Sequence, residues 1–446
     1  MASRGKNRRR HEPDGPFEAQ IEDLSQDARG VARVDGKVVF ITDALAGETV
    51  RYMRTRKKSS FDEGELLEVV SASADRVEPG CQHFGLCGGC SLQHLSADAQ
   101  ILFKQGQMLE SLQRIGKVEP EVVAPPLCGP QWAYRRRARL GVKDVPAKGR
   151  VLVGFRERGN PFIAMLERCE VLQAPVNDML MSLSDLVGQL SIRNKVPQIE
   201  LAAGDNAIGM VLRIMAPLTA RDRELLIQWS RDNSVWFYLQ TGGLDTVEPL
   251  LEDTPELTFK LDDGALELAF NPTDFLQVNG ELNERMVQQA MNWLAPSASD
   301  RVLELFCGLG NFSLPLARRA AQVTAVEGEA GLVARAQANA VRNNVTNVDF
   351  HVADLFEDQS KAEWLKRSYD VALIDPPRAG AEAAIGWLAS AGVARILYVS
   401  CHPATLARDA ELLVHKYGYR LSKAGVLDMF PHTQHVESMA LFERDV

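Results

Sequence analysis

The sequence predicts a multidomain protein with an OB-like β-barrel at the N-terminus, an α+β central domain and a doubly wound α/β domain at the C-terminus. Three observations support this fold class. Residues 17–72 show short strand patterns without a helical one, residues 73–95 hold a cysteine cluster, and strands alternate with helices from about residue 272. The predicted divisions are a disordered basic tail over residues 1–16, the barrel over 17–72, the central domain over 73–271 and the α/β domain over 272–446.

Composition indicates a soluble protein rather than a membrane protein. The 446 residues are 46% hydrophobic and 24% charged, and no apolar run approaches the length of a membrane span. The basic N-terminus is not followed by the apolar stretch of a secretory signal. We therefore expect a cytoplasmic protein with no membrane association, whose seven cysteines are kept reduced.

The distribution of charge is more informative than the net charge of −9. Residues 1–150 carry a small excess of Lys and Arg, whereas the remainder is strongly acidic. Basic side chains gather at Arg4–Arg10, Arg51–Lys58 and Arg135–Arg139. Such clusters can neutralise phosphates, although each could equally be a solvated face or a tail.

The barrel is predicted from a hairpin signal and from the strands around it. Apolar residues flank Asp35-Gly36, and further strand patterns cover residues 38–41, 49–54 and 65–70. Barrels of this kind commonly bind nucleic acid on one face, and the basic strand Arg51–Lys58 would supply it. A barrel that serves only as a protein contact is the alternative.

The α/β domain is predicted from five strand patterns separated by helical ones. A helical stripe over residues 282–294 precedes them, and another helix is expected over 329–343. The strands are expected at residues 301–306, 322–326, 348–352, 370–374 and 395–400. Because the carboxyl ends of parallel strands form the ligand crevice of such folds, residues just after each strand are candidates for the site.

The loop after the first of these strands suits a nucleoside-containing cofactor. Gly308 and Gly310 allow a ligand to approach the backbone, and Glu327 ends the next strand at a distance that suits a ribose-binding carboxylate. Asp354 follows the third strand. A dinucleotide remains an alternative, but Ser313 stands where its fingerprint requires a third glycine or alanine. A turn without any ligand is the simplest alternative.

The fourth and fifth strands end in polar residues followed by proline. One runs into Asp375-Pro376-Pro377-Arg378 and the other into Ser400-Cys401-His402-Pro403. A cysteine at a strand tip in such a crevice is a candidate nucleophile, although a free cysteine is more often a small buried residue. His402 could act as a base or could merely form the turn.

The cysteine cluster Cys81-x5-Cys87-x2-Cys90, with glycines between its members, indicates a metal site. A fourth ligand must come from elsewhere, and Cys128 and Cys169 are candidates. Four thiolates suit either zinc or an iron–sulfur cluster, and the spacing does not decide between them.

These motifs together resemble those of the RNA uracil-C5 methyltransferase family. The resemblance covers almost the whole chain and rests on Phe275-Leu276-Gln277-Val278-Asn279, Asp375-Pro376-Pro377-Arg378, Ser400-Cys401-His402-Pro403 and Val436-Glu437-Ser438. It implies a TRAM domain as the barrel, a Rossmann-like class I methyltransferase domain at the C-terminus, and S-adenosylmethionine as the methyl donor. Family members that combine the barrel with the cysteine cluster act on 23S rRNA, which is therefore the expected partner, with no obligate protein partner.

The resemblance also implies roles for individual residues. Cys401 would be the nucleophile that adds to carbon 6 of uracil, and Glu437 would be the base that removes the proton from carbon 5. Phe275 would stack on the target base. The cofactor would be held by Gln277, Phe306, Asn311, Glu327, Asp354 and Asp375. Asparagine is expected in place of Asp354 in some members, and His402 replaces a common asparagine.

The family binds a [4Fe–4S] cluster, and the resemblance assigns its ligands to Cys81, Cys87, Cys90 and Cys169. Several alternatives to the whole assignment stay open. The same chemistry could act on another rRNA uracil or on tRNA. An amino-group methyltransferase would need no cysteine but would need an aromatic residue where Arg378 stands. A non-catalytic iron–sulfur RNA-binding protein would need no methyl donor, and a nicotinamide enzyme would need the missing glycine.

Overall fold

The computed structural model describes residues 14–444, which belong to two compact units. The first unit comprises residues up to Gly85, Gly89–Leu102 and His432–Gln434, and the second comprises Leu86–Gly88, Phe103–Pro431 and the residues from His435 onward. The expected disordered tail falls largely outside the described residues. Its last three residues, Asp14–Pro16, are instead the start of a strand.

The first unit contains a six-stranded sheet in the order β1-β5-β6-β4-β3-β2. The turn Asp35-Gly36 has the positive φ angles (51° and 79°) of a tight hairpin, as the sequence predicts. Strands from both ends of the order contribute to one buried core that includes Ala19, Ile41 and Tyr52. The strands are β1 (Asp14–Gln20), β2 (Asp23–Leu24), β3 (Gly30–Val34), β4 (Lys37–Thr42), β5 (Thr49–Lys57) and β6 (Phe61–Ser71).

The second unit contains a six-stranded sheet in its first half, ordered β13-β12-β11-β10-β8-β9. The only parallel pair within this sheet is β11 with β12. Its strands are β8 (Arg137–Val145), β9 (Arg150–Gly154), β10 (Gln198–Ala203), β11 (Ile208–Arg213), β12 (Val235–Gln240) and β13 (Val247–Pro249). The helices α2 (Leu180–Gln189) and α3 (Ala220–Asn233) accompany this sheet, and α1 (Ala97–Ser111) precedes it in the chain.

A two-stranded hairpin of β14 (Leu257–Leu261) and β15 (Leu266–Phe270) follows, and it leads through residues 271–279 into helix α4 (Gly280–Leu294). Asn279 caps this helix, because its side-chain oxygen accepts a hydrogen bond from the Leu282 amide at 3.2 Å. The segment 271–279, which carries Phe275 and Gln277, therefore connects strand β15 to the capped start of helix α4.

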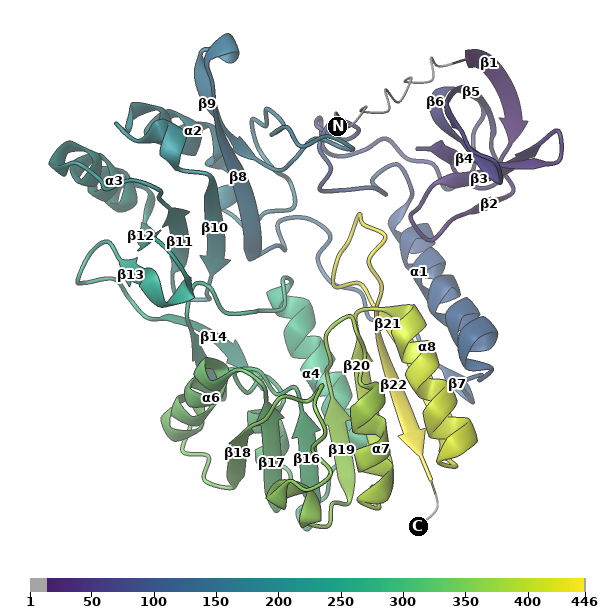
Figure 1. The fold of residues 1–446 in the computed structure, drawn as a ribbon, viewed down its shortest axis with the longest axis vertical. Helices are drawn as coiled ribbons and strands as arrows, with labels where there is room; N and C mark the ends of the chain where they lie inside the picture. Colours follow the sequence, from purple (N-terminus) through teal and green to yellow (C-terminus); the bar gives the residue numbers. More distant parts are fainter. Residues whose placement is uncertain (1–13, 445–446) are drawn as a thin grey trace, which may run out of the picture. The chain divides into compact units, whose positions relative to one another are not determined.

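The C-terminal half is an eight-stranded sheet in the order β18-β17-β16-β19-β20-β22-β21-β7 (Figure 1). Strands β16 to β20 are parallel, β22 runs antiparallel between β20 and β21, and the chain order reverses beside β16. The strands are β7 (Val122–Val123), β16 (Arg301–Leu305), β17 (Gln322–Glu327), β18 (Val348–Val352), β19 (Val371–Ile374), β20 (Arg395–Ser400), β21 (Arg420–Leu427) and β22 (Glu437–Glu443).

The five predicted parallel strands are thus confirmed, and so is the doubly wound arrangement. Strand β7 is an addition that comes from residues far earlier in the chain and pairs with β21. The helices that follow α4 are α5 (Ser313–Ala317), α6 (Ala330–Arg342), α7 (Glu382–Ser390) and α8 (Pro403–Glu411). Figure 1 labels the last three of these. Within residues 14–444, no helix is both long and apolar enough to cross a lipid bilayer.

Candidate active site

The candidate nucleophile and base are brought together by the register of two strands. Antiparallel pairing of β20 with β22 places Ser400 opposite Ser438. The residue after Ser400 is Cys401 and the residue before Ser438 is Glu437, so the two functional side chains occupy the next level of the same ladder. Strand β22 runs opposite to the parallel strands, so it begins at the edge of the sheet where they end. Glu437, its first residue, therefore lies at the edge where such folds bind ligands.

Asp375 joins this pair from the neighbouring strand tip. It follows β19 directly, and its backbone amide donates to the Leu305 carbonyl at the end of β16 at 3.4 Å. Asp375 and Glu437 both influence the ionisation of Cys401 through their charges. The structure therefore brings together Asp375, which follows β19, Cys401, which follows β20, and Glu437, which begins β22.

Burial and repulsion between carboxylates dominate the electrostatics of these groups. Burial raises the pKa of Asp375 to about 7, and repulsion from Glu327 adds to this effect. Burial also raises the pKa of Glu437 well above its usual range, where repulsion from Asp375 adds to the effect and Arg378 opposes it. Burial and the carboxylates of Glu437 and Asp375 raise the pKa of the Cys401 thiol to about 11. In the protein alone, the thiol is consequently protonated at neutral pH.

The cofactor loop after β16 has a backbone that only particular residues tolerate. Gly310 has φ 101°, a backbone conformation that favours glycine, and a Cβ there would also lie 2.6 Å from the end of the Leu314 side chain. Phe306 also has a positive φ, 64°, which is unusual for a residue other than glycine. Such conformations concentrate at ligand-binding sites, because the surrounding structure must hold them in place.

Glu327 is fixed at the tip of β17 by backbone amides. One carboxylate oxygen accepts from Gly308 at 3.1 Å, and the other accepts from Gly328 at 2.7 Å and Glu329 at 3.1 Å. Asn311, at the end of the cofactor loop, exchanges two hydrogen bonds with the side chain of Asn283 in α4 at 2.9 and 3.0 Å. The loop is thereby tied both to the next strand and to the helix that precedes the sheet.

Asp354 is exposed after β18 and accepts a hydrogen bond from the Phe356 amide at 2.9 Å. The Phe356 ring lies 5.9 Å from the Phe306 ring, and its side chain is 56% exposed. Sequence reasoning missed Phe356 as a candidate site residue. An exposed aromatic two residues after a candidate adenine-binding carboxylate is the signal that could have identified it, because exposed rings are costly without a partner.

Glu304 is a further buried carboxyl group beneath the loop. It is 1% exposed and accepts from the Ser313 hydroxyl at 2.5 Å, and burial raises its pKa to about 8. Repulsion from Asp375 and Glu327 adds to the effect of burial. Glu304, Asp375 and Glu327 therefore lie close enough to influence one another's ionisation, and they would attract a cation when they are ionised.

The arginine cluster Arg135–Arg139, for which the sequence left a phosphate contact and a solvated face open, has two members that bind the protein's own backbone. Arg136 is 4% exposed, and its guanidinium donates to the Gln277 carbonyl at 3.0 Å, while its backbone amide donates to the Val278 carbonyl. Arg137 donates to the Pro272 carbonyl and is paired with Glu200. These side chains hold the segment 271–279 in place, and they position Gln277, which is buried, and Phe275, which is 71% exposed.

The basic strand Arg51–Lys58 of the first unit, predicted to supply a nucleic-acid-binding face, has carboxylates beside its cationic side chains. Each of its five cationic side chains contacts a carboxylate of the same unit. The closest pair joins Arg54 to Asp14 through two hydrogen bonds of 2.9 Å. The surface there carries mixed charge, and phosphate binding would have to compete with these ion pairs. The cluster Arg4–Arg10 lies outside the described residues.

The four candidate cluster ligands lie in several segments. In the first unit, Cys81 and Cys90 are half-buried, and the Cys81 amide donates to the Gln93 side chain at 3.0 Å. In the second unit, Cys87 lies on a strand-like segment paired with residues 156–158, and Cys169 is buried. In the part of the chain that the structure describes, no three or more His, Cys, Asp or Glu side chains are grouped so as to hold a metal ion.

Comparison with known proteins gives matches over the whole chain. Residues 249–445 match the family model described as tRNA (Uracil-5-)-methyltransferase, and residues 17–51 match the TRAM domain model. The chain is 48% identical to the 23S rRNA (uracil(1939)-C(5))-methyltransferase RlmD of Methylococcus capsulatus, with 100% of both chains covered. It is 50% identical to the protein of the same name from Nitrosococcus oceani, with 96% of both chains covered.

One solved structure is similar over nearly the whole chain. It is the Pyrococcus abyssi tRNA (uracil-54, C5)-methyltransferase in complex with S-adenosyl-L-homocysteine, with a TM-score of 0.74 and 24% identity. The match covers 95% of this chain and 99% of that chain. At this identity the similarity establishes a common fold.

We predict that Glu437→Gln lowers the pKa of the Cys401 thiol below its value of about 11, because the variant removes a carboxylate that repels the thiolate. The measurement is the rate of iodoacetamide modification of the Cys401 peptide against pH, followed by mass spectrometry. Glu443→Gln, at the far end of the same strand, is the matched control and should leave the profile unchanged. An unchanged or higher midpoint in Glu437→Gln would contradict the electrostatic picture.

Proposed function

The chain belongs to the RNA uracil-C5 methyltransferase family, and from this premise we propose that it methylates carbon 5 of a specific uracil in 23S rRNA, with S-adenosylmethionine as methyl donor. The relatives that match its full length at about half identity are named for this activity. The single observation that carries the chemistry is the strand register that sets Cys401 beside Glu437 at the ligand edge of the sheet.

The residues supply the steps that this reaction needs. Carbon 5 of uracil is a weak nucleophile. Addition of the Cys401 thiolate to carbon 6 converts the uracil ring to an enolate, whose carbon 5 can then accept a methyl group. Glu437 then removes the proton from carbon 5, and the thiolate leaves from carbon 6. The methyl group would come from the sulfonium of bound S-adenosylmethionine. Because the thiol is protonated in the protein alone, it must lose its proton before it can add to carbon 6.

The carboxyl groups around the cofactor loop support S-adenosylmethionine over a dinucleotide. When ionised, Glu304, Glu327 and Asp375 would stabilise a cationic sulfonium but would repel a pyrophosphate. We propose that Glu327 binds the ribose and that Phe306, Asn311 and Asp354 complete the nucleoside site. Gln277 and Asp375 would hold the remainder of the cofactor, and Phe275 would stack on the target base. The uracil must leave its stack to reach Cys401.

The central experiment tests the nucleophile and the base separately. Cys401→Ala should abolish formation of 5-methyluridine in 23S rRNA fragments, because no enolate can form. Glu437→Gln should accumulate a protein–RNA adduct that survives denaturing electrophoresis, since elimination requires loss of the carbon-5 proton. Products are quantified by nucleoside mass spectrometry, with tRNA as the competing substrate and Cys307→Ala as the thiol control. Full formation of 5-methyluridine by Cys401→Ala would contradict the covalent mechanism, whereas an N-methylated nucleoside formed equally by wild type and Cys401→Ala would favour an amino-group methyltransferase.

We predict that affinity for S-adenosylmethionine rises between pH 6 and pH 8. Asp375 and Glu304, with pKa values of about 7 and about 8, lose protons in this range and become attractive to the sulfonium cation. Titration calorimetry should show a weaker pH dependence for S-adenosylhomocysteine, whose thioether is neutral, and a flatter curve for Asp375→Asn. Equal slopes for the two ligands would argue against this electrostatic role.

We also propose that Cys81, Cys87, Cys90 and Cys169 hold a [4Fe–4S] cluster, on the basis of their spacing, their thiol chemistry and the family resemblance. Protein purified without oxygen should be brown and should contain about four iron and four sulfide ions per chain, because each cluster consists of these atoms. Cys81→Ser should lose both, whereas Cys128→Ser should keep them. A colourless wild-type protein that contains zinc would overturn this proposal.

A further inference from the structure

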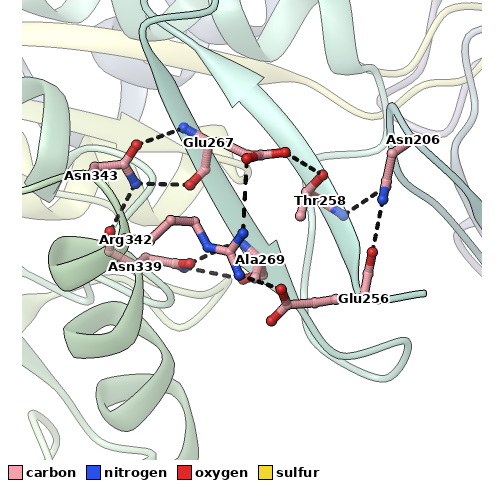
Figure 2. A network of polar contacts seen from close by, with 8 residues as sticks. All are labelled: Asn206, Glu256, Thr258, Glu267, Ala269, Asn339, Arg342 and Asn343. Carbon is pink, nitrogen blue, oxygen red and sulfur yellow. Dashed lines mark hydrogen bonds and ion pairs between the residues drawn. The ribbon is translucent and has the colours of Figure 1, made fainter. Parts of the chain in front are cut away.

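Helix α6 presents a row of polar side chains to strand β15. This strand leads into residues 271–279, which carry Phe275 and are called the target-base segment below. Arg335, Asn339 and Asn343 are four residues apart, so they lie on one face of the helix. Figure 2 shows the two asparagine side chains pointing at the backbone of β15. Strand β15 pairs with β14 on one side, and the asparagines satisfy its other edge.

Each asparagine pairs with one strand residue as a neighbouring strand would. The Asn343 side chain accepts from the Glu267 amide and donates to the Glu267 carbonyl, both at 2.8 Å. The Asn339 side chain accepts from the Ala269 amide at 2.8 Å and donates to the Ala269 carbonyl at 3.1 Å (Figure 2). The spacing of the two asparagines along the helix matches the spacing of Glu267 and Ala269 along the strand. Four residues of an α-helix rise about 6 Å, and two residues of a β-strand rise about 6.8 Å.

Asn339 makes one contact that Asn343 lacks. Its side-chain nitrogen also donates to the Leu309 carbonyl at 3.1 Å, and Leu309 lies between Gly308 and Gly310 in the cofactor loop. The Asn339 side chain is 1% exposed, and its donors and its acceptor are all engaged. One buried carboxamide thus connects the cofactor loop to the strand that precedes the target-base segment.

The same helix holds the far end of that segment. Arg335 donates to Asp274 at 2.6 Å, and Asp274 is buried and directly precedes Phe275. The stretch between Ala269 and Phe275 is therefore fixed to α6 at both ends. Any displacement of Asn339 would move the cofactor loop relative to Phe275.

We propose that Asn339 is a positioning residue for methyl transfer, which sets the cofactor loop and the target-base segment in one fixed relation. This inference rests on the proposed function. Asn339 does not touch the reacting atoms, and it acts through the Leu309 and Ala269 backbone. Because an unsatisfied buried polar group costs roughly a factor of ten in an equilibrium, loss of the carboxamide should be measurable at the cofactor site.

The test compares Asn339→Leu with Asn343→Leu, which removes a similar amide pair without touching the cofactor loop. Both should lower the melting temperature. Asn339→Leu should weaken S-adenosylhomocysteine binding about tenfold by calorimetry and raise KM for S-adenosylmethionine in step, whereas Asn343→Leu should stay within about twofold of wild type. Equal effects of the two variants on cofactor binding, or no effect of Asn339→Leu, would overturn the proposal.

A measurement on the wild-type protein keeps the test decisive if Asn339→Leu fails to fold. S-adenosylhomocysteine should slow amide hydrogen exchange at Gly308–Asn311 and also at Glu267–Ala269, because Asn339 joins the two. Slowing at the loop alone would overturn the coupling. A wild-type protein that binds no S-adenosylhomocysteine would instead refute the proposed function. This result can be told apart from a failure of the Asn339 coupling, in which the wild-type protein binds the ligand but only the loop is slowed.

Discussion

Pairing between β20 and β22 is the constraint on which the candidate active site depends. These strands are separated by α8 and β21 in the chain, yet their register sets Cys401 and Glu437 at the same level of the sheet. A slip of one residue would turn every side chain of β22 to the other face and would remove Glu437 from the crevice. Consecutive residues of β22, including Met439, Ala440 and Phe442, are buried, so both faces of this strand are covered by the rest of the domain.

The same arrangement has an electrostatic cost in the protein alone. The folded-state pKa values of Asp375, Glu304 and Glu437 all lie above those of the unfolded chain. The folded state therefore binds protons more tightly, and the contribution of these groups to stability is fully present below their ordinary pKa values. It is lost as pH rises through about 7 and about 8 for Asp375 and Glu304. Stability is sacrificed where a cationic ligand must bind.

Buried polar side chains hold the segment between β15 and α4 from both sides. Arg136 and Arg137 donate to backbone carbonyls of this segment from the side of β8, and Arg335 and Asn339 hold its approach from α6. Irregular backbone cannot satisfy its own hydrogen bonds, so these side chains replace the missing partners. The exposed Phe275 is thus carried on a backbone that is itself immobilised.

The sequence by itself determined the local structure and the chemical types of the site residues. Apolar periodicity identified the five parallel strands and α4, and the Asp35-Gly36 pair identified a hairpin. Cys401, Asp375 and Glu327 could be expected at one edge, because strand tips in a doubly wound sheet share that edge. Glu437 could be assigned only by family resemblance, since nothing local marks it as a base.

Only the tertiary structure decided which side chains meet across the chain. Arginines in a run look alike in the sequence, but the fold buries Arg136 against Gln277 and leaves Arg139 70% exposed. The carboxylates that pair with the basic strand, and the two backbone carbonyls that bind Asn339, come from elements that pack together although they are separate in the sequence. Local patterns follow from backbone geometry and side-chain periodicity, whereas such pairings depend on register and burial, which the whole core sets at once.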